Sequence, residues 1–466
     1  MPGLAAPGPT TPGPAEGQEP TTRGGSAPVH PRRRFLSSAA FGTAALLAGG
    51  ATGFGVRVIS EPDEAAAVAA GGAGGPDPVN SAGPDAATVP FYSEHQAGIT
   101  TRQQEQMMFA AFDVTTLDTR ALQQMLGRWA AVGARFTQGL TTSGGEPAAN
   151  RPPDDTGEGL DLGAHSLTIT VGFGTSLFDD RFGLANKMPK SLAPFGRLPG
   201  EADMKPDITG GDICVQACAD DPQVVFHAIR NLIRIARGTA VLRWSQLGFG
   251  RASATGTGQR TPRNLFGFKD GTRNIHAEET ADLDADVWVG QETDQQWMRG
   301  GSFLVTRKIA MIIESWDATA LAEQERIFGR RKASGAPLSG GDEFARPDFE
   351  AKAAVAGRGE RSATTAPAID ARAHVRLAAP EQNNGVRILR RGYNYTDGQD
   401  VTTGRLDAGL FFIAFQKDLG QFRALQTKLG TSDLLNEYIT HIGGGTWACP
   451  PGVSKAGDWF GKALFG

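Results

Sequence analysis

The sequence predicts an α+β protein in which one β-α-β-β-α-β unit occurs twice. Apolar residues recur at strand-like and helix-like spacings in a repeated order along the chain. A chain of 466 residues also has room for two such units behind an N-terminal extension. In the first unit the expected elements are strand 107–114, helix 118–139, strands 166–174 and 213–220, helix 222–238 and strand 240–250.

In the second unit the expected elements are strand 301–312, helix 317–330, a short strand-like run at 374–378, strand 409–416 and a last element at 434–442. The β-α-β-β-α-β order is that of the split β-α-β, or ferredoxin-like, motif. We therefore predict two ferredoxin-like domains with antiparallel sheets, one over residues 89–300 and one over residues 301–466.

Residues 1–56 are expected to form a disordered segment followed by an export signal. Residues 1–30 are rich in Pro, Gly, Thr and Ala and too poor in large apolar residues to build a core. Arg32 and Arg33 then precede two large apolar residues and a weakly apolar, Ala- and Gly-rich stretch, which resembles a twin-arginine signal. Pro31 departs from that pattern, which usually has Ser or Thr at this place.

A transmembrane anchor is the alternative, because the apolar stretch is close to the ~20 residues that span a bilayer. Its glycines favour a cleaved signal. Residues 57–88 are again rich in Ala, Gly and Pro and are expected to be a linker with the cleavage site. We therefore expect the twin-arginine export machinery as a partner, no stable membrane insertion after processing, and a periplasmic, extracellular or cell-envelope location.

The charge balance points to small-molecule chemistry. Forty-six basic and fifty acidic residues leave a formal charge of -4, which gives no electrostatic footprint for nucleic acid or an anionic membrane. The three cysteines, Cys214, Cys218 and Cys449, are too few for a disulfide framework. We expect them to be buried thiols.

The strongest local signal for a functional site is the segment NLFGFKDGTRNI, in which Gly267, Asp270 and Gly271 place a carboxylate within a turn. Small residues on either side of the acid let the backbone approach a flat ligand closely. Read alone, however, Asp-Gly indicates only a turn. A functional interpretation therefore needs partner residues elsewhere in the chain.

Candidate partners lie in the segment AHVRLAAPEQNNGVRILRRGYNY. His374 falls in its short apolar, strand-like run, and Arg390 follows sixteen residues later, far enough for the chain to fold back across a pocket. A neutral imidazole suits haem iron as an axial ligand. A lone histidine is nevertheless more often a hydrogen-bonded core residue.

Five segments taken together resemble the dye-decolourising peroxidase family, and in particular its exported, deferrochelatase-like members. In chain order they are FYSEHQAGI, GFKDGTRN, AHVRLAAP, ILRRGYNY and GLFFIAFQKD, and the resemblance spans about residues 89–466. It implies that the two ferredoxin-like domains enclose a pocket for one haem b per chain. It also implies a peroxidase that uses hydrogen peroxide to oxidise dyes, phenolics or other organic reductants. Whether the chain forms a homodimer is left open.

The resemblance implies the central roles in this pocket. His374 matches the proximal ligand of the haem iron, Asp270 the distal acid, and Arg390 the distal arginine. Arg390 takes the family's place directly after Ile388 and Leu389, whereas the neighbouring arginine falls one step further on.

Other residues are expected to surround the haem. Arg307 matches a position that pairs with a haem propionate, and the alternative is a surface charge at a strand end. Asp433 matches the carboxylate that accepts the second N–H of the proximal histidine. It can equally be a helix N-cap, and Glu437 competes for the role. The residues expected to line the haem edge follow the distal acid and are Gly271, Thr272 and Arg273.

In the expected mechanism, Asp270 takes a proton from the inner peroxide oxygen and returns it to the outer one, while Arg390 stabilises the developing charge. Because aspartate stays ionised at lower pH than histidine, we expect an acidic optimum. Surface aromatics are candidates for passing electrons to bulky substrates, namely Trp297, Trp447 and Tyr438. The alternatives are release of iron from haem, and a non-catalytic haem carrier that needs neither Asp270 nor Arg390.

Five other histidines show no metal-like pairing and are expected to have structural or surface roles; they are His95, His165, His227, His276 and His441. The glycine-rich segment at 329–342 is expected to be an ordinary loop, because it does not open a helix after a clear strand.

Overall fold

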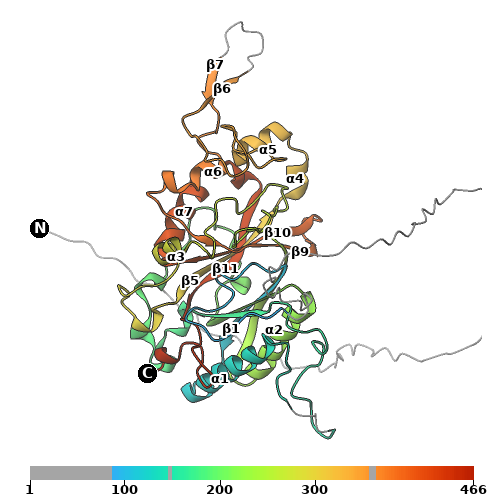
Figure 1. The fold of residues 1–466 in the computed structure, drawn as a ribbon, viewed down its shortest axis with the longest axis vertical. Coiled ribbons are helices and arrows are strands. Elements are labelled where there is room, and N and C mark those ends of the chain that lie inside the picture. Colours follow the sequence, from blue (N-terminus) through green and yellow to red (C-terminus); the bar gives the residue numbers. More distant parts are fainter. Residues whose placement is uncertain (1–86, 145–148, 356–363) are drawn as a thin grey trace, which may run out of the picture. The chain divides into compact units, whose positions relative to one another are not determined.

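A nine-stranded antiparallel sheet forms the centre of the fold in the computed structural model, which describes residues 87–144, 149–355 and 364–466 (Figure 1). The predicted disordered segment and export signal, and most of the predicted linker, lie outside these residues. Among the described helices, none combines the length and the apolar character that crossing a bilayer requires.

The first β-α-β-β-α-β unit is confirmed. Its elements are β1 (Gln106–Val114), α1 (Thr119–Phe136), β2 (Thr168–Gly174), β3 (Ile213–Ala219), α2 (Pro222–Ala236) and β4 (Ala240–Arg251). Asp118 and Asp221 begin the two helices, because each side chain accepts hydrogen bonds from backbone N–H groups of the first turn. All six elements lie within a few residues of the predicted bounds.

The second unit is confirmed in outline and differs in detail. Its main elements are β5 (Ser302–Met311), α4 (Ile313–Asp317), α5 (Leu321–Phe328), α6 (His374–Leu377), β9 (Tyr393–Gln399), β10 (Leu406–Gln416), α7 (Leu419–Ser432) and β11 (Ile439–Cys449). The smaller elements are α3 (Thr280–Asp286), the two-residue strand β8 (Leu389–Arg390), and a separate hairpin of β6 (Lys352–Val355) and β7 (Thr364–Pro367).

The prediction of a strand at 374–378 was wrong, because this run forms the helical turn α6. The N–H groups of Leu377 and Ala378 donate to the carbonyls of Ala373 and His374, four residues earlier. A run of about five apolar residues is too short for periodicity to separate a strand from a helical turn. The last expected element, 434–442, combines a 3-10 turn at Leu434–Glu437 with the start of β11.

The strand order shows two ferredoxin-like units that share one sheet. The order β2-β3-β1-β4 in the first unit is repeated as β9-β10-β5-β11 in the second. Because β11 pairs with β2 and β4 pairs with β9, the sheet closes into a barrel. The predicted fold class, α+β with ferredoxin-like units and antiparallel pairing, is therefore confirmed.

Both faces of the sheet are buried along β1, whereas every second residue over most of β4 is exposed. Met108, Ala110 and Phe112 belong to the core between sheet and helices, whereas Phe109 belongs to the core inside the barrel. Helices α1 and α2 cover the outer face of the first unit, and α4 to α7 lie on the other side of the strands (Figure 1). Inside the barrel, the aromatic rings of both units pack with centroids 5.1–6.3 Å apart, and these are Phe109, Trp244, Phe411 and Trp447.

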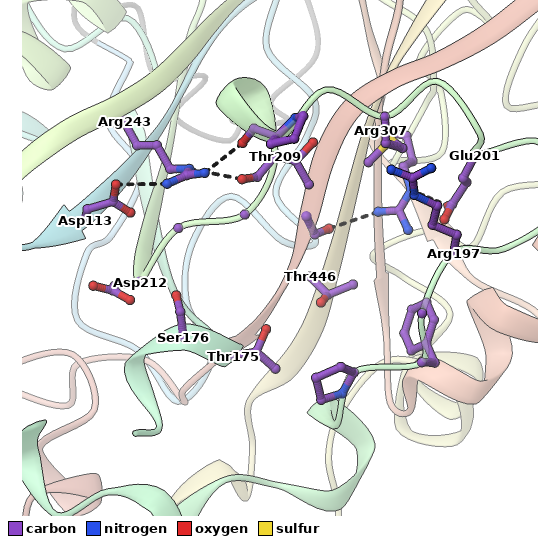
Figure 2. A pocket seen from close by; sticks show the side chains of 18 of the residues that line it. Asp113, Thr175, Ser176, Arg197, Glu201, Thr209, Asp212, Arg243, Arg307 and Thr446 are labelled. Atoms are coloured by element: carbon purple, nitrogen blue, oxygen red, sulfur yellow. Dashed lines mark hydrogen bonds and ion pairs between the residues drawn. The ribbon is translucent and has the colours of Figure 1, made fainter. Parts of the chain in front are cut away.

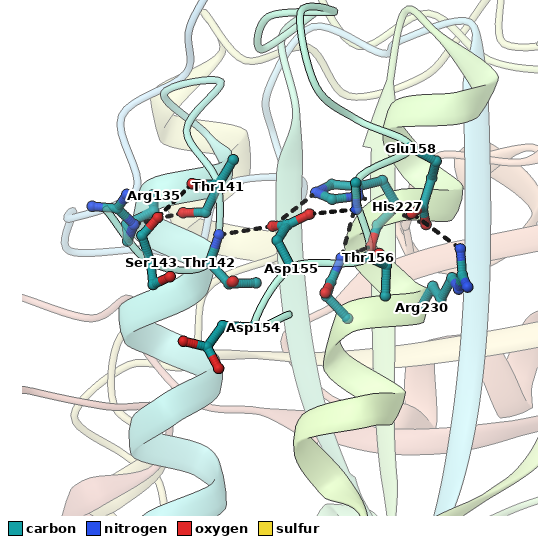
Figure 3. Close-up of polar contacts among 12 residues, drawn as sticks. Arg135, Thr141, Thr142, Ser143, Asp154, Asp155, Thr156, Glu158, His227 and Arg230 are labelled. Carbon is teal, nitrogen blue, oxygen red and sulfur yellow. Dashed lines mark hydrogen bonds and ion pairs between the residues drawn. The ribbon is translucent and has the colours of Figure 1, made fainter. Parts of the chain in front are cut away.

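A polar cluster fastens the connection between α1 and β2 onto α2 (Figure 3). His227 on α2 lies between Asp155, 3.6 Å away, and Glu158, 3.7 Å away. Glu158 also pairs with Arg230 at 3.1 Å, and Asp155 accepts a hydrogen bond from the backbone of Thr142. The three cysteines are buried free thiols, as predicted.

Trp129 joins α1 to α2 and to the sheet. Its side chain is fully buried, packs on Phe112 and donates a 2.9 Å hydrogen bond to the carbonyl of Leu232. We expect Trp129→Ala to lower the free energy of unfolding by about 3–5 kcal/mol, measured by urea denaturation. Trp129→Phe, which keeps a ring and loses the hydrogen bond, should lie in between. Equal effects of Trp129→Ala and of Leu117→Ala, at a site that is 75% exposed, would contradict this packing role.

Candidate active site

His374 and Asp433 form the first pair of the site. His374 opens the short helix α6, and its Nδ1–H donates a 2.6 Å hydrogen bond to Oδ2 of Asp433, whose side chain is 3% exposed. The other oxygen, Oδ1, accepts a 2.9 Å hydrogen bond from the N–H of Leu435. Asp433 therefore fills both predicted roles, partner of the histidine and N-cap of the following turn. Glu437 is exposed and does not line the cavity.

The carboxylate determines how the imidazole is oriented. Burial alone would lower the pKa of His374, but the charge and hydrogen bond of Asp433 outweigh it and raise that pKa above its ordinary value. His374 lines a cavity, and with Nδ1 bound to Asp433 only Nε2 is left for a ligand.

Asp270 enters the same cavity from a tight turn. Gly271 has φ +95°, and a Cβ there would lie 3.0 Å from the Cα of Ser253 and from the N of Ala254. Only glycine fits both constraints, so the turn packs closely and presents Asp270 to the cavity. The N–H of Asp270 donates to the carbonyl of Pro262 at 3.0 Å.

Arg390 completes the second pair. Its Nη1 donates a 2.5 Å hydrogen bond to Oδ1 of Asp270. Asn274 holds the Arg390 backbone on both sides, accepting from its N–H and donating to its carbonyl, each at 2.8 Å. No motif marks Asn274 for this positioning role, beyond its place four residues after Asp270. Arg391 is fully buried elsewhere and donates to Thr101 and Gln104, so the distinction between the two arginines holds structurally.

Arg307 lies in β5 with 4% exposure, so the alternative of a surface charge is wrong. Its Nε donates a 2.6 Å hydrogen bond to the buried carboxylate of Glu201. The strand β11 places His441 on the same cavity wall, so the expectation of only a structural or surface role for His441 was wrong. Nδ1 of His441 is buried and has no hydrogen-bond partner among the described residues. Burial and the nearby charge of Arg307 lower the pKa of His441 to about 4, so the His441 imidazole is neutral at pH 7.

The cavity rim carries further polar groups. Arg273 forms a 2.7 Å ion pair with Glu381, and the buried hydroxyl of Thr272 has no partner within the described part of the chain. Arg330 also lines the cavity, from the segment at 329–342, whose sequence predicts only a loop. Burial, with repulsion from Arg273 and Arg390, lowers the pKa of Arg330 to about 10.

Two of the three expected electron-transfer residues, both tryptophans, are not on the surface. Trp447 is fully buried inside the barrel, and Trp297 is 6% exposed. Tyr438 is half-buried and packs on Trp316, with ring centroids 5.0 Å apart. A direct surface role for the two tryptophans is therefore excluded.

The lining fits a haem. A carboxylate-backed imidazole is an iron-ligand arrangement, and two buried polar atoms, Nδ1 of His441 and Oγ1 of Thr272, lack partners in the described protein. Apolar side chains between these polar groups suit a flat macrocycle, and they are Ile309, Met311, Leu410, Phe412, Leu425, Leu429 and Leu435. With an acid–arginine pair in the same cavity, fold and site define a haem-binding enzyme of the peroxidase class.

Comparison with known proteins agrees with this class. The family descriptions "Dyp-type peroxidase, N-terminal" and "Dyp-type peroxidase, C-terminal" match residues 96–250 and 261–454. The chain belongs to the DyP-type peroxidase family, as the sequence resemblance implied. It is accordingly a haem-dependent peroxidase, an oxidoreductase.

Similar proteins include both enzymes and solved structures. The chain is 39% identical to a deferrochelatase of Escherichia coli K12 over 381 residues, which cover 80% of this chain and 86% of the relative. DtpA from Streptomyces lividans is 35% identical, with a TM-score of 0.71 over 82% of this chain and 99% of that one. A DyP-type peroxidase from Cellulomonas bogoriensis is 34% identical, with a TM-score of 0.70 over 82% and 99%.

The contact between Asp433 and His374 predicts a change in haem affinity. Asp433→Asn keeps the capping oxygen but loses the negative charge behind the imidazole. We expect haem to leave roughly 10- to 100-fold faster, measured by transfer to apomyoglobin, and the iron midpoint potential to rise. Asp418→Asn is the matched control, because Asp418 caps α7 without lining the cavity. If both variants behave alike, Asp433 serves only as a cap.

Proposed function

We propose that the cavity holds one haem b per chain, that Nε2 of His374 would bind its iron, and that hydrogen peroxide is reduced there while dyes, phenolics or other organic reductants are oxidised. One observation carries the proposal, namely that the Asp270–Arg390 pair and the His374–Asp433 pair line one cavity. The haem supplies the redox chemistry when it is bound. Arg307 and His441 are the proposed contacts of its propionates, with Gly271, Thr272 and Arg273 along its edge.

Asp270 is the proposed acid–base residue, acting through Oδ2. Its Oδ1 is occupied by Arg390, whereas Oδ2 has only a long 3.4 Å hydrogen bond from Asn264. Oδ2 is thus the oxygen free to take a proton from one peroxide oxygen and return it to the other. In balance, peroxide, two protons and two electrons give two waters.

Arg390 is the proposed electrostatic partner. Its hydrogen bond fixes Asp270 in place and sets a positive charge beside the carboxylate. The remaining N–H donors of the planar guanidinium can stabilise charge that develops as the O–O bond breaks.

Two substitutions test the proposed acid–base role of Asp270 and the electrostatic role of Arg390. Asp270→Asn retains the Oδ1 contact and loses the base, so the second-order rate with peroxide should fall roughly 10²- to 10⁴-fold in stopped-flow measurements of the Soret band. Arg390→Lys keeps the charge but loses the donor fork, and should also be impaired. Asp458→Asn, at an ion pair with Lys462, is the control. A wild-type rate in Asp270→Asn would refute the acid–base role.

Release of iron from haem is the second candidate, and it is favoured by the deferrochelatase name of a relative that is 39% identical. It is tested by incubating the protein with haem under reducing conditions without peroxide and quantifying protoporphyrin by chromatography. Recovered protoporphyrin in excess of a His374→Ala control would support iron release. Dye bleaching that needs peroxide, Asp270 and Arg390 would support the peroxidase. A carrier would show neither reaction.

We propose further that residues 1–56 direct the chain through the twin-arginine route, with cleavage within 57–88 and a periplasmic, extracellular or cell-envelope destination. The Arg32-Arg33 pair and the mild apolar stretch behind it support this route.

A further inference from the structure

A second cavity of about 760 Å³ lies where the two units of the barrel meet (Figure 2). Strand ends of the first unit and β11 of the second line it. In Figure 2, Arg243 and Asp113 lie at one end and Arg307, Glu201 and Arg197 at the other. Apart from Arg307, no residue that lines it takes part in the peroxide chemistry or the haem contacts proposed above.

Arg307 lies between the two cavities, because it lines both of them. Its guanidinium is held from three sides, by Glu201 and by the carbonyls of Thr306 and Gly445 at 2.8 and 3.2 Å. A molecule in the second cavity would therefore lie one side chain away from the haem cavity.

Among the charged side chains that line the second cavity, one arginine has no carboxylate partner within the described residues. Arg181 makes two 3.0 Å hydrogen bonds to Asp212, Arg243 contacts Asp113 at 3.1 Å, and Arg307 pairs with Glu201. Arg197 is exposed, and its one side-chain hydrogen bond to the described residues goes to the carbonyl of Ala202, at 3.2 Å. The cavity thus offers a guanidinium without a carboxylate, which suits a single anionic group.

The rest of the lining suits a flat, partly polar ring. Apolar surface comes from Pro194, Phe195, Met204 and Pro206, and hydroxyl groups come from Thr175, Ser176 and Thr446. Glycine backbone supplies another part of the wall, at Gly210, Gly211 and Gly445.

Two tryptophans lie directly behind this glycine wall. Trp244 donates a 2.8 Å hydrogen bond to the carbonyl of Gly210. A Cβ at Gly445 would lie only 2.4 Å from the ring of Trp447. The two indole rings are 6.3 Å apart. A ligand in the cavity is therefore close to oxidisable rings in the barrel interior, although neither ring is on the surface.

We propose that the second cavity binds a monoanionic aromatic reductant, a phenol that carries a carboxylate or sulfonate, with Arg197 holding the anionic group. This inference rests on the proposed peroxidase function. Each bound phenol gives up one electron and its hydroxyl proton, so two phenols are consumed for each peroxide that becomes two waters. Arg197 acts as a specificity residue, because it selects the charge of the donor.

Binding is tested without peroxide, on the haem-loaded protein, so that the haem cavity is filled. The probe is naphthalene-2-sulfonate, titrated by isothermal calorimetry, and the neutral naphthalene-2-sulfonamide is its matched partner. We expect Arg197→Glu to weaken sulfonate binding by roughly tenfold or more and to affect the sulfonamide far less. Arg128→Glu is the control, an equally exposed arginine on α1 outside the cavity.

A second variant tests whether the probes bind in this cavity, without changing its charge. Ser176→Trp puts an indole into the cavity from an exposed lining position, so both naphthalene probes should lose binding. In steady-state turnover, the ratio of kcat/KM for 4-hydroxybenzenesulfonate to that for guaiacol should fall roughly tenfold in Arg197→Glu, through KM.

The outcomes separate this inference from the function on which it rests. Wild-type sulfonate binding in both Arg197→Glu and Ser176→Trp would overturn the site, while the peroxide reaction of the haem protein would be untouched by that result. Sulfonate binding that depends on Arg197 in a protein that fails to react with peroxide would overturn the proposed function, and with it the role of the ligand as a reductant.

Discussion

The closure of the antiparallel sheet is the constraint on which both cavities depend. Successive side chains along a strand point to opposite faces of the sheet. Both faces are buried along β2 and β3, where the sheet is covered on the outside and closed around the barrel interior. In β5, Leu304 points into the barrel, Val305 packs in the outer core, and Arg307 faces the cavities. A cation at such a position is buried, and leaving it unpaired would be strongly destabilising. Glu201 supplies the required charge from the long connection between β2 and β3.

A carboxylate partner recurs at three nitrogen groups of the haem cavity. Asp433 orients His374, Asp270 pairs with Arg390, and Glu201 pairs with Arg307. In every case the carboxylate comes from a turn or connection, whereas Arg307 and Arg390 lie on strands and His374 opens a helical turn. The barrel thus fixes the arginines, and the connecting segments complete their charge pairs. Such fixed dipoles and charges need little reorganisation during a reaction, which is the physical basis of electrostatic catalysis.

Elements with a clear period could be predicted from the sequence, and elements whose identity depends on packing could not. Along β1 to β4, α1 and α2, apolar residues follow a single strand or helix period over a long run. The structure places all six elements close to their predicted ranges. The run that begins at His374 is too short for a period, and it forms a helical turn. The strand β9 was missed because its second half, from Thr396, is exposed and lacks an apolar pattern.

The site residues also fall into those that could be predicted and those that could not. Asp270, His374 and Arg390 lie in segments whose sequence indicated a functional site, and the structure brings all three to one cavity. Asn274 and His441 could not be recognised, because an amide or an imidazole acquires its role only from neighbours far along the chain. In β11, the register shifts between His441 and Gly443, and this irregularity is invisible in the sequence. Such a shift changes which side chains face the cavity, so strand alternation alone would not have assigned His441 to the haem side.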